Sequence, residues 1–120
     1  MKKPPAPRTF VFLDRVFDID KARGILVAKP RPARPLKLSE TFGMASLVKV
    51  DATRARAIDH LDMDPVTTAW IDDWGKLKIK PGRIVIDGWH RVWNAIYNDY
   101  GSILAVDLDK EESKEVRIDE

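Results

Sequence analysis

Residues 87–91, Asp-Gly-Trp-His-Arg, combine the residue types that hold a phosphate group. A glycine lets the backbone turn tightly, and the first N–H groups of a helix that begins there have no partner within the helix. These N–H groups lie at the positive end of the helix dipole, where anions bind. His90 and Arg91 add donors for phosphate oxygens, and Asp87 can cap the helix or hold a magnesium ion. The segment therefore predicts a phosphate site that includes Gly88 and the N–H groups of about Trp89, His90 and Arg91.

The sequence around this turn predicts the strand and the helix that would position it. Residues 83–86 are typical of a strand, and the apolar residues from Trp89 onward fall at 89, 92, 93, 96, 97 and 100. That spacing is the stripe of a helix packed on a sheet. Trp89, Trp93, Ile96 and Tyr100 are expected to face inward. Three polar side chains lie off the stripe and are predicted to be available to a ligand: His90, Arg91 and Asn94.

A purely structural interpretation of the same residues stays open. Asp87 could serve only as the helix cap, and His90 only as a neutral hydrogen-bonding group. Arg91 could form a surface ion pair with Asp99 or Asp51.

The other predicted elements make an α+β domain, a small mixed sheet with packed helices. We expect strands at residues 9–13, 16–19, 24–28, 46–50, 66–71 and 103–106, a short strand or loop at 77–79, and a helix at 52–61 capped by Asp51. The turn at 20–23 predicts an N-terminal β-hairpin. Residues 29–37 hold three prolines, which predict an exposed connection.

Length and composition predict one domain. The chain has 120 residues, 44% of them hydrophobic, which is enough for a single core. We expect a flexible basic arm at residues 1–8, the domain at 9–108 and an acidic tail at 109–120. The chain has no cysteine, so thiol chemistry is excluded, and it has no apolar run of about 20 residues, so a cytoplasmic location is expected.

Charge is distributed unevenly along the chain. Residues 1–37 hold ten Lys and Arg against three Asp, while residues 38–120 hold eleven against sixteen Asp and Glu. Such asymmetry can indicate contact with nucleic acid or an acidic partner, although basic residues among prolines can also be simply solvated. No groove-reading helix accompanies the basic segment, so sequence-specific DNA recognition is not expected.

The sequence IVIDGWHRVWNA at residues 84–95 resembles the nucleotide-binding box of the ParB/sulfiredoxin-like superfamily. The match is close over residues 66–106. Gly88 matches the turn glycine, His90 and Arg91 match the basic pair that contacts nucleotide phosphates, and Ala95 matches the small residue of the helix. The resemblance implies a ParB/sulfiredoxin-like fold and a nucleoside di- or triphosphate bound with Mg²⁺.

Departures from the family narrow the expected function. Sulfiredoxins carry a nucleophilic cysteine where this chain has Trp89, so sulfinate repair is excluded. Chromosome-segregation members carry Glu-Arg-Arg after the glycine and continue into further domains, so a complete partition protein is excluded as well. Kinases with this box use a carboxylate as base, and Glu40 or Asp72 could serve if either folded against Asp87.

Two functions remain in view, and a third is weaker. The first is a nucleotide-binding protein, which could include weak nucleotide hydrolysis or phosphoryl transfer. The alternative is a non-catalytic phage- or plasmid-encoded accessory or inhibitor protein that docks on a protein or nucleic-acid complex. A nuclease would need several carboxylates on a metal, and only Asp87 is placed. No membrane partner is expected, and the oligomeric state is open.

Two further features carry weaker predictions. His60 lies among aspartates, but no second ligand at metal-site spacing accompanies it, so a helix-end histidine is favoured over a metal site. Trp74, in a predicted turn, is the tryptophan expected to be exposed, where it could stack on a base or anchor a partner.

Overall fold

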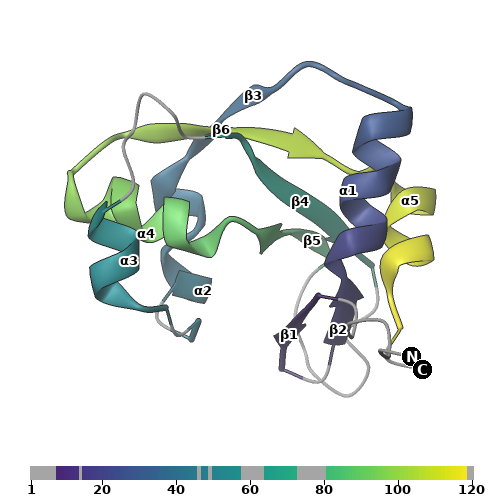
Figure 1. The fold of residues 1–120 in the computed structure, drawn as a ribbon, viewed down its shortest axis with the longest axis horizontal. Coiled ribbons are helices and arrows are strands. Elements are labelled where there is room, and N and C mark those ends of the chain that lie inside the picture. Colours follow the sequence, from purple (N-terminus) through teal and green to yellow (C-terminus); the bar gives the residue numbers. More distant parts are fainter. Residues whose placement is uncertain are drawn as a thin grey trace, which may run out of the picture.

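A mixed four-stranded sheet forms the centre of the computed structural model (Figure 1), which describes residues 8–13, 15–45, 47–48, 50–57, 64–72 and 81–118. In the described residues its strand order is β3-β6-β4-β5, with β4 antiparallel to β5 and parallel to β6, and β3 antiparallel to β6. The strands are β3 (Arg34–Lys37), β4 (Val66–Ile71), β5 (Gly82–Asp87) and β6 (Ser102–Asp107). A separate hairpin consists of β1 (Thr9–Phe12) and β2 (Arg15–Asp18).

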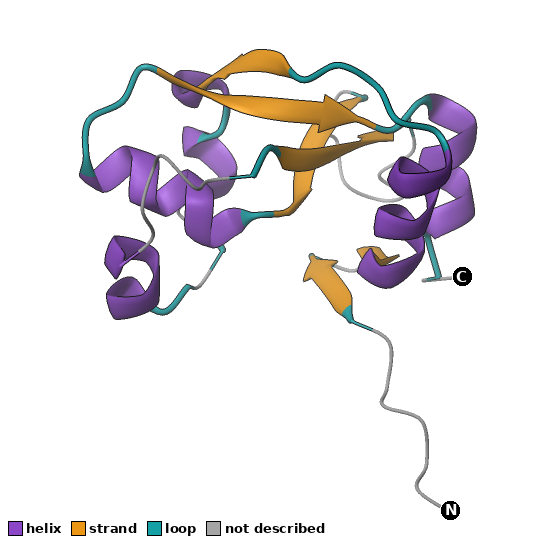
Figure 2. Cartoon of the chain, turned by 45° about the horizontal axis from the view of Figure 1, so that its top comes forward, coloured by secondary structure: helices purple, strands orange, loops and turns teal. Residues whose placement is uncertain are grey.

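Helices cover both faces of this sheet (Figure 2). The helices are α1 (Ile19–Ala28), α2 (Phe42–Ala45), α3 (Ala52–Ala57), α4 (Trp89–Tyr97) and α5 (Lys110–Val116), with a 3₁₀ turn η1 (Leu38–Glu40). The hairpin, α1 and α5 pack on one face, and η1, α2 and α4 pack on the other. Because both faces are covered, β4 is buried along most of its length, and β5 has three consecutive buried residues at 84–86 rather than alternate ones.

The alternation of side chains along β5 divides the core between the two faces. Ile84 and Ile86 pack with the hairpin, α1 and α5, whereas Val85 packs with Trp89 of α4. Successive strand residues point to opposite faces of a sheet. The strand that ends at the predicted phosphate turn is thus fixed from both sides.

The predictions for the second half of the chain are confirmed in most elements. Strands occupy 66–71, 82–87 and 102–107, and α4 begins at Trp89 as expected. Helix α3 begins after Asp51, whose carboxylate accepts a hydrogen bond from the Arg54 N–H at 3.2 Å. The later part of the predicted helix at 52–61 and the segment at 77–79 lie outside the described residues.

An N-terminal hairpin exists as expected, but not around the predicted turn. It pairs residues 9–12 with 15–18, and both the expected turn at 20–23 and the expected strand at 24–28 belong to helix α1 instead. Asp18 caps α1 by accepting a hydrogen bond from the Lys21 N–H. Ile19 and Ala22 are buried one helical turn apart, so packing on the sheet outweighs the β-propensity of the Gly-Ile-Leu-Val run.

Two further predictions for the first half of the chain are wrong. Residues 46–50 were expected to form a strand, but the described ones form a turn between α2 and α3, with Leu47 exposed. The predicted connection at 29–37 ends in the edge strand β3. Pro35 fits there because an edge strand needs backbone donors on one side alone.

The expected acidic tail contributes a packed helix. Asp109 caps α5 in a capping box with Glu112, and Val116 is fully buried in the core shared with α1. Beyond the helix, Arg117 pairs with Phe17, and the Ile118 N–H donates to the Val16 carbonyl at 3.0 Å. The C-terminal segment therefore extends the N-terminal hairpin.

None of the helices in the described residues is long and apolar enough to cross a membrane.

Candidate anion-binding site

Gly88 makes the sharp turn between β5 and α4. Its φ of 104° and ψ of 23° lie in the left-handed region, and it is the N-cap residue of α4. A Cβ at this position would lie 2.7 Å from Cγ1 of Val66. The glycine is therefore required both by the backbone conformation and by its close approach to β4. The junction lies between α1 and the hairpin on one side and α3 on the other (Figure 1).

The turn opens into a pocket of about 620 Å³. The pocket has an apolar wall, in which Phe10 stacks on Trp89 with ring centroids 6.4 Å apart. Val48 and Val50, which were predicted to be in a strand, also line the pocket. Pockets of about 300–1,000 Å³ with a few polar groups are the usual size of small-molecule sites.

Five charged or ionisable side chains line this pocket, and four of them are basic types: Arg8, Arg23, Arg54, Asp87 and His90. With neutral histidine, three guanidinium groups and one carboxylate leave the lining with two positive charges. This charge favours an anion.

The arginines of the pocket differ in what they contact. Arg23, from α1, donates to both carboxylate oxygens of Asp87 at 2.9 and 3.2 Å. This bond to Asp87 raises the pKa of Arg23 against the effect of its burial. In the described part of the chain, the guanidinium groups of Arg8 and Arg54 form no ion pair.

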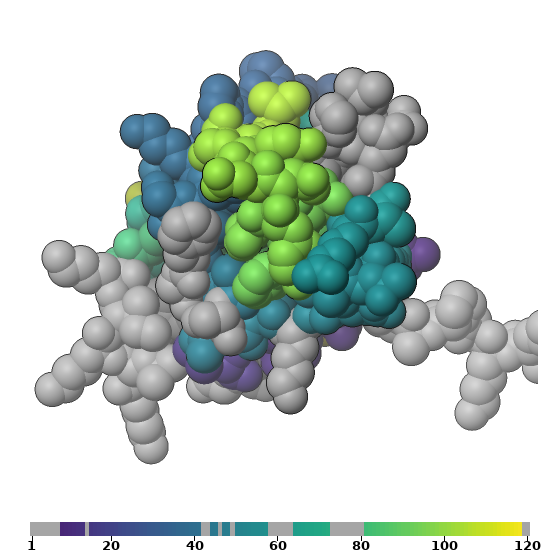
Figure 3. Space-filling model, turned by 90° about the vertical axis from the view of Figure 1, so that its left-hand side faces the viewer, coloured from purple at the N-terminus to yellow at the C-terminus, as the bar shows by residue number. Residues whose placement is uncertain are grey.

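His90 is held by the start of α3. Its Nε2 accepts a hydrogen bond from the Asp51 N–H at 3.4 Å, which leaves Nδ1 as the donor nitrogen in this arrangement. Helix α3 also lies against α4, as Figure 3 shows. The same short helix thus orients His90 and brings Arg54 to the pocket.

A second pocket, of about 510 Å³, shares Arg23 and Asp87 with the first. Its remaining lining includes Leu26 and Val27 of α1 and Arg91 of α4. Arg91 donates through one nitrogen to the carbonyls of Asp64 and Pro65, at 3.0 and 2.6 Å. The predicted basic pair is therefore divided, because His90 lines the first pocket and Arg91 the second.

Three expectations about α4 need correction. Asn94 is 1% exposed, and its side-chain N–H donates to the Ala55 carbonyl at 2.8 Å, so it ties α4 to α3 and is not available to a ligand. The Arg91 N–H donates to the Gly88 carbonyl at 2.9 Å, so it is not one of the unpartnered amides. Arg91 also bonds to carbonyls rather than to Asp99 or Asp51.

The structure does not place Glu40 or Asp72, the two carboxylates considered as a base, beside Asp87. Glu40 lines a different, small cavity of about 70 Å³. In the β4–β5 register Thr67 pairs with Asp87 and Ile71 with Gly82, so Asp72 lies beyond the other end of the pair, roughly 16 Å away. Within the described residues, no three His, Cys, Asp or Glu side chains are grouped to hold a metal ion. His60 and Trp74 lie outside the described residues.

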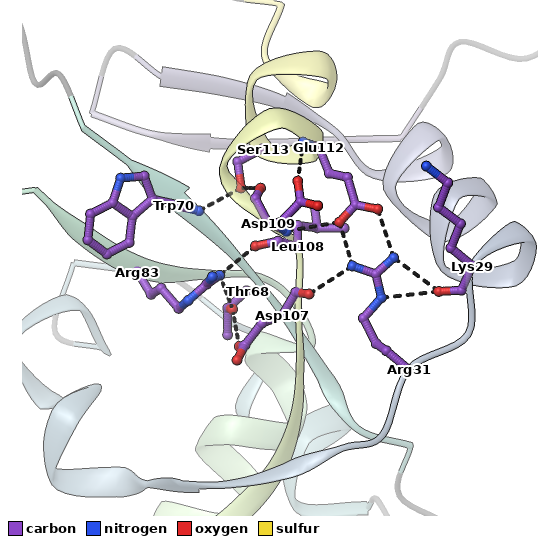
Figure 4. Close-up of polar contacts among 10 residues, drawn as sticks. All are labelled: Lys29, Arg31, Thr68, Trp70, Arg83, Asp107, Leu108, Asp109, Glu112 and Ser113. Atoms are coloured by element: carbon purple, nitrogen blue, oxygen red, sulfur yellow. Dashed lines mark hydrogen bonds and ion pairs between the residues drawn. The ribbon is translucent and has the colours of Figure 1, made fainter.

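The basic segment at 29–37 contacts the C-terminal helix (Figure 4). Arg31 forms a bidentate ion pair with Glu112, and it lowers the pKa of Glu112 to about 2. Burial disfavours the charged form of Asp107, but hydrogen bonds from Arg34 and Thr68 and the charge of Arg83 outweigh it and lower the Asp107 pKa. The positive charges of Arg31 and Arg34 are thus balanced within the fold.

Three residues that supply the positive charge of the first pocket were not predicted to line it: Arg8, Arg23 and Arg54. No local motif marks them. Arg54 was identified as part of a helix that follows Asp51, but its position beside His90 depends on how α3 packs on α4. Arg23 was assigned to a turn, so its approach to Asp87 could not be expected.

The chain matches no protein-family model, no curated protein and no solved structure. The resemblance of residues 84–95 to the ParB/sulfiredoxin-like box therefore stays a prediction.

Proposed function

We propose that this protein binds a nucleotide through its phosphate groups in the pocket at the start of α4. The observation that carries the proposal is the pair of arginines, Arg8 and Arg54, that line this pocket and have no ion-pair partner among the described residues. Charge-assisted hydrogen bonds from arginine to phosphate are strong and geometrically matched. The pocket is also large enough for a nucleotide and has an apolar wall.

Each group in the pocket has a place in this proposal. Arg8, Arg54 and the donor nitrogen of His90 bind phosphate oxygens, and the N–H groups of Trp89 and His90, which have no backbone acceptor among the described residues, add to them. Gly88 keeps the backbone close to the ligand. A magnesium ion carried by a nucleoside di- or triphosphate would meet the carboxylate of Asp87 there. Weak hydrolysis or phosphoryl transfer would follow as an activity of the same site, in keeping with a ParB/sulfiredoxin-like protein.

The test is calorimetric titration at low ionic strength with ATP, ADP, CTP and GTP, each with and without magnesium. Arg54→Ala removes a charged phosphate contact worth about 1.5–3 kcal/mol, so we expect affinity to fall about tenfold or more. Arg56→Ala is the matched control, since Arg56 lies on the same helix but over the ring of Tyr97. Equal affinity of folded Arg54→Ala and wild type would contradict the proposal.

A docking protein, such as a phage or plasmid accessory protein, is the second candidate. The hairpin favours it, because Val11, Leu13 and Ile118 expose about half of their surface there. Among the described residues β1 pairs with β2 alone, so its outer edge is open to a partner strand. Amide hydrogen exchange separates the two candidates: a docked partner would protect β1, and a nucleotide would protect the start of α4.

A further inference from the structure

The Arg23–Asp87 ion pair stands between the two pockets and lines both. Both carboxylate oxygens of Asp87 accept from the guanidinium of Arg23, through Nε at 2.9 Å and Nη2 at 3.2 Å. The pair therefore uses the bidentate geometry with which arginine also binds phosphate. A phosphate in the first pocket would offer Arg23 the same kind of partner.

The Arg23–Asp87 ion pair is weak enough for a phosphate to replace Asp87 as the partner of Arg23. The side chain of Arg23 is 45% exposed and that of Asp87 is 16% exposed. Ion pairs that reach solvent contribute little net stability, because water screens them and the long side chain loses freedom. A dianionic phosphate beside Arg8 and Arg54 would compete with Asp87 for Arg23, because it carries more negative charge than one carboxylate.

We propose that Arg23 is a phosphate-binding residue that is paired with Asp87 until a ligand binds. The Asp87 carboxylate and the phosphate of the ligand then compete for one guanidinium group. This inference rests on the proposed function. It assigns a residue outside the 87–91 turn to the site, and it gives Asp87 an inhibitory role in the absence of metal.

Substitution of Asp87 should strengthen ligand binding rather than weaken it. Asp87→Asn keeps the shape of the side chain but releases Arg23 and removes a negative charge from the pocket. We therefore expect the variant to bind ADP in EDTA about three- to tenfold more tightly than wild type. If Asp87 also holds magnesium, the same variant should bind ADP less tightly than wild type when magnesium is present.

The experiment is a titration of ADP into wild type, Asp87→Asn, Arg23→Ala and the double variant, in EDTA at low ionic strength. Competition requires Arg23, so the gain from Asp87→Asn should be clearly smaller in the Arg23→Ala background. Asp107→Asn is the matched control, because it releases Arg34 from a similar pair that does not line the first pocket. Its affinity should equal that of wild type.

The outcomes separate this inference from the proposed function. If wild type binds ADP and Arg54→Ala weakens binding, but Asp87→Asn binds no more tightly, the inference alone is overturned. An equal gain with and without Arg23 also overturns it, since removal of charge would then be sufficient. If neither wild type nor any variant binds any of the nucleotides, the proposed function fails and the inference with it. Circular dichroism confirms that each variant is folded.

Discussion

At the scale of single residues, Gly88 is the position that a substitution would disturb most directly. Gly88→Ala places a Cβ 2.7 Å from Val66 Cγ1 on a backbone with φ of 104°. Backbone strain and crowding together should lower the free energy of unfolding by about 2–4 kcal/mol. Urea denaturation followed by circular dichroism measures this change.

Gly24 provides the control for Gly88. It lies inside α1, and a Cβ there would meet no atom within 4 Å. Alanine should therefore raise stability by about 0.5–1 kcal/mol, because glycine is the weaker helix former. Equal effects of the two substitutions would show that the turn at Gly88 is not constrained as described.

The sequence located the turn but not the arrangement of charge around it. A strand, a glycine and an amphipathic helix are local patterns, and all three were predictable at residues 83–97. The contacts of Arg23 and Arg54 depend on how α1 and α3 pack, and they join residues far apart in the chain. Asn94 shows the same limit, because a polar residue beside the apolar stripe was buried by a neighbouring helix.

At the scale of elements, helix α5 is part of the fold rather than an appended tail. Val116 is fully buried against the core that includes Phe17 and Ile19. Val116→Ala removes two buried methyl groups and leaves a cavity, so we expect a loss of about 1.5–3 kcal/mol. The neighbouring exposed residue is the control, and Glu115→Ala should change stability by less than about 0.5 kcal/mol. Equal midpoints of thermal unfolding for Val116→Ala and wild type would indicate a detached tail.

Helix α5 was not predicted, because its sequence is mostly charged. Residues 110–116 contain two apolar or small buried positions, Ser113 and Val116, one turn apart, which is too short a stripe to mark a helix. Its capping box, Asp109 with Glu112, was the available local signal. In α1 the opposite error occurred. A β-prone run was predicted to be a strand, but the N-cap and the buried face stabilise it as part of a helix.

At the scale of the whole molecule, ion pairs between the basic and acidic parts of the chain make stability depend on pH. Arg31 lowers the pKa of Glu112 to about 2 from an ordinary value of 4.5. The folded state therefore binds this proton less readily than the unfolded state, and the pair stabilises the fold above about pH 5. As pH falls from about 5 to 2, stability on the order of 2–3 kcal/mol should be lost, and Asp107 adds to the loss in the same direction.

Glu112→Gln isolates this contribution. The variant should be less stable than wild type at pH 7, and the difference should shrink toward zero near pH 2, where Glu112 of wild type is itself becoming protonated. Urea titrations at pH 7, 5, 3 and 2 measure the difference. A gap that stays constant across this range would mean that the loss comes from packing and not from charge.

The pairing of residues 117 and 118 with strand β2 joins segments about one hundred positions apart. During synthesis the hairpin at residues 9–18 emerges from the ribosome early, but its outer neighbour does not exist until residue 118 has been added. Contacts of such long sequence separation also form slowly in a complete chain, because a large loop must close first. The hairpin is therefore made before its partner segment and is among the last parts of the fold to acquire its full set of contacts, and a nascent chain without residues 117 and 118 exposes one side of it.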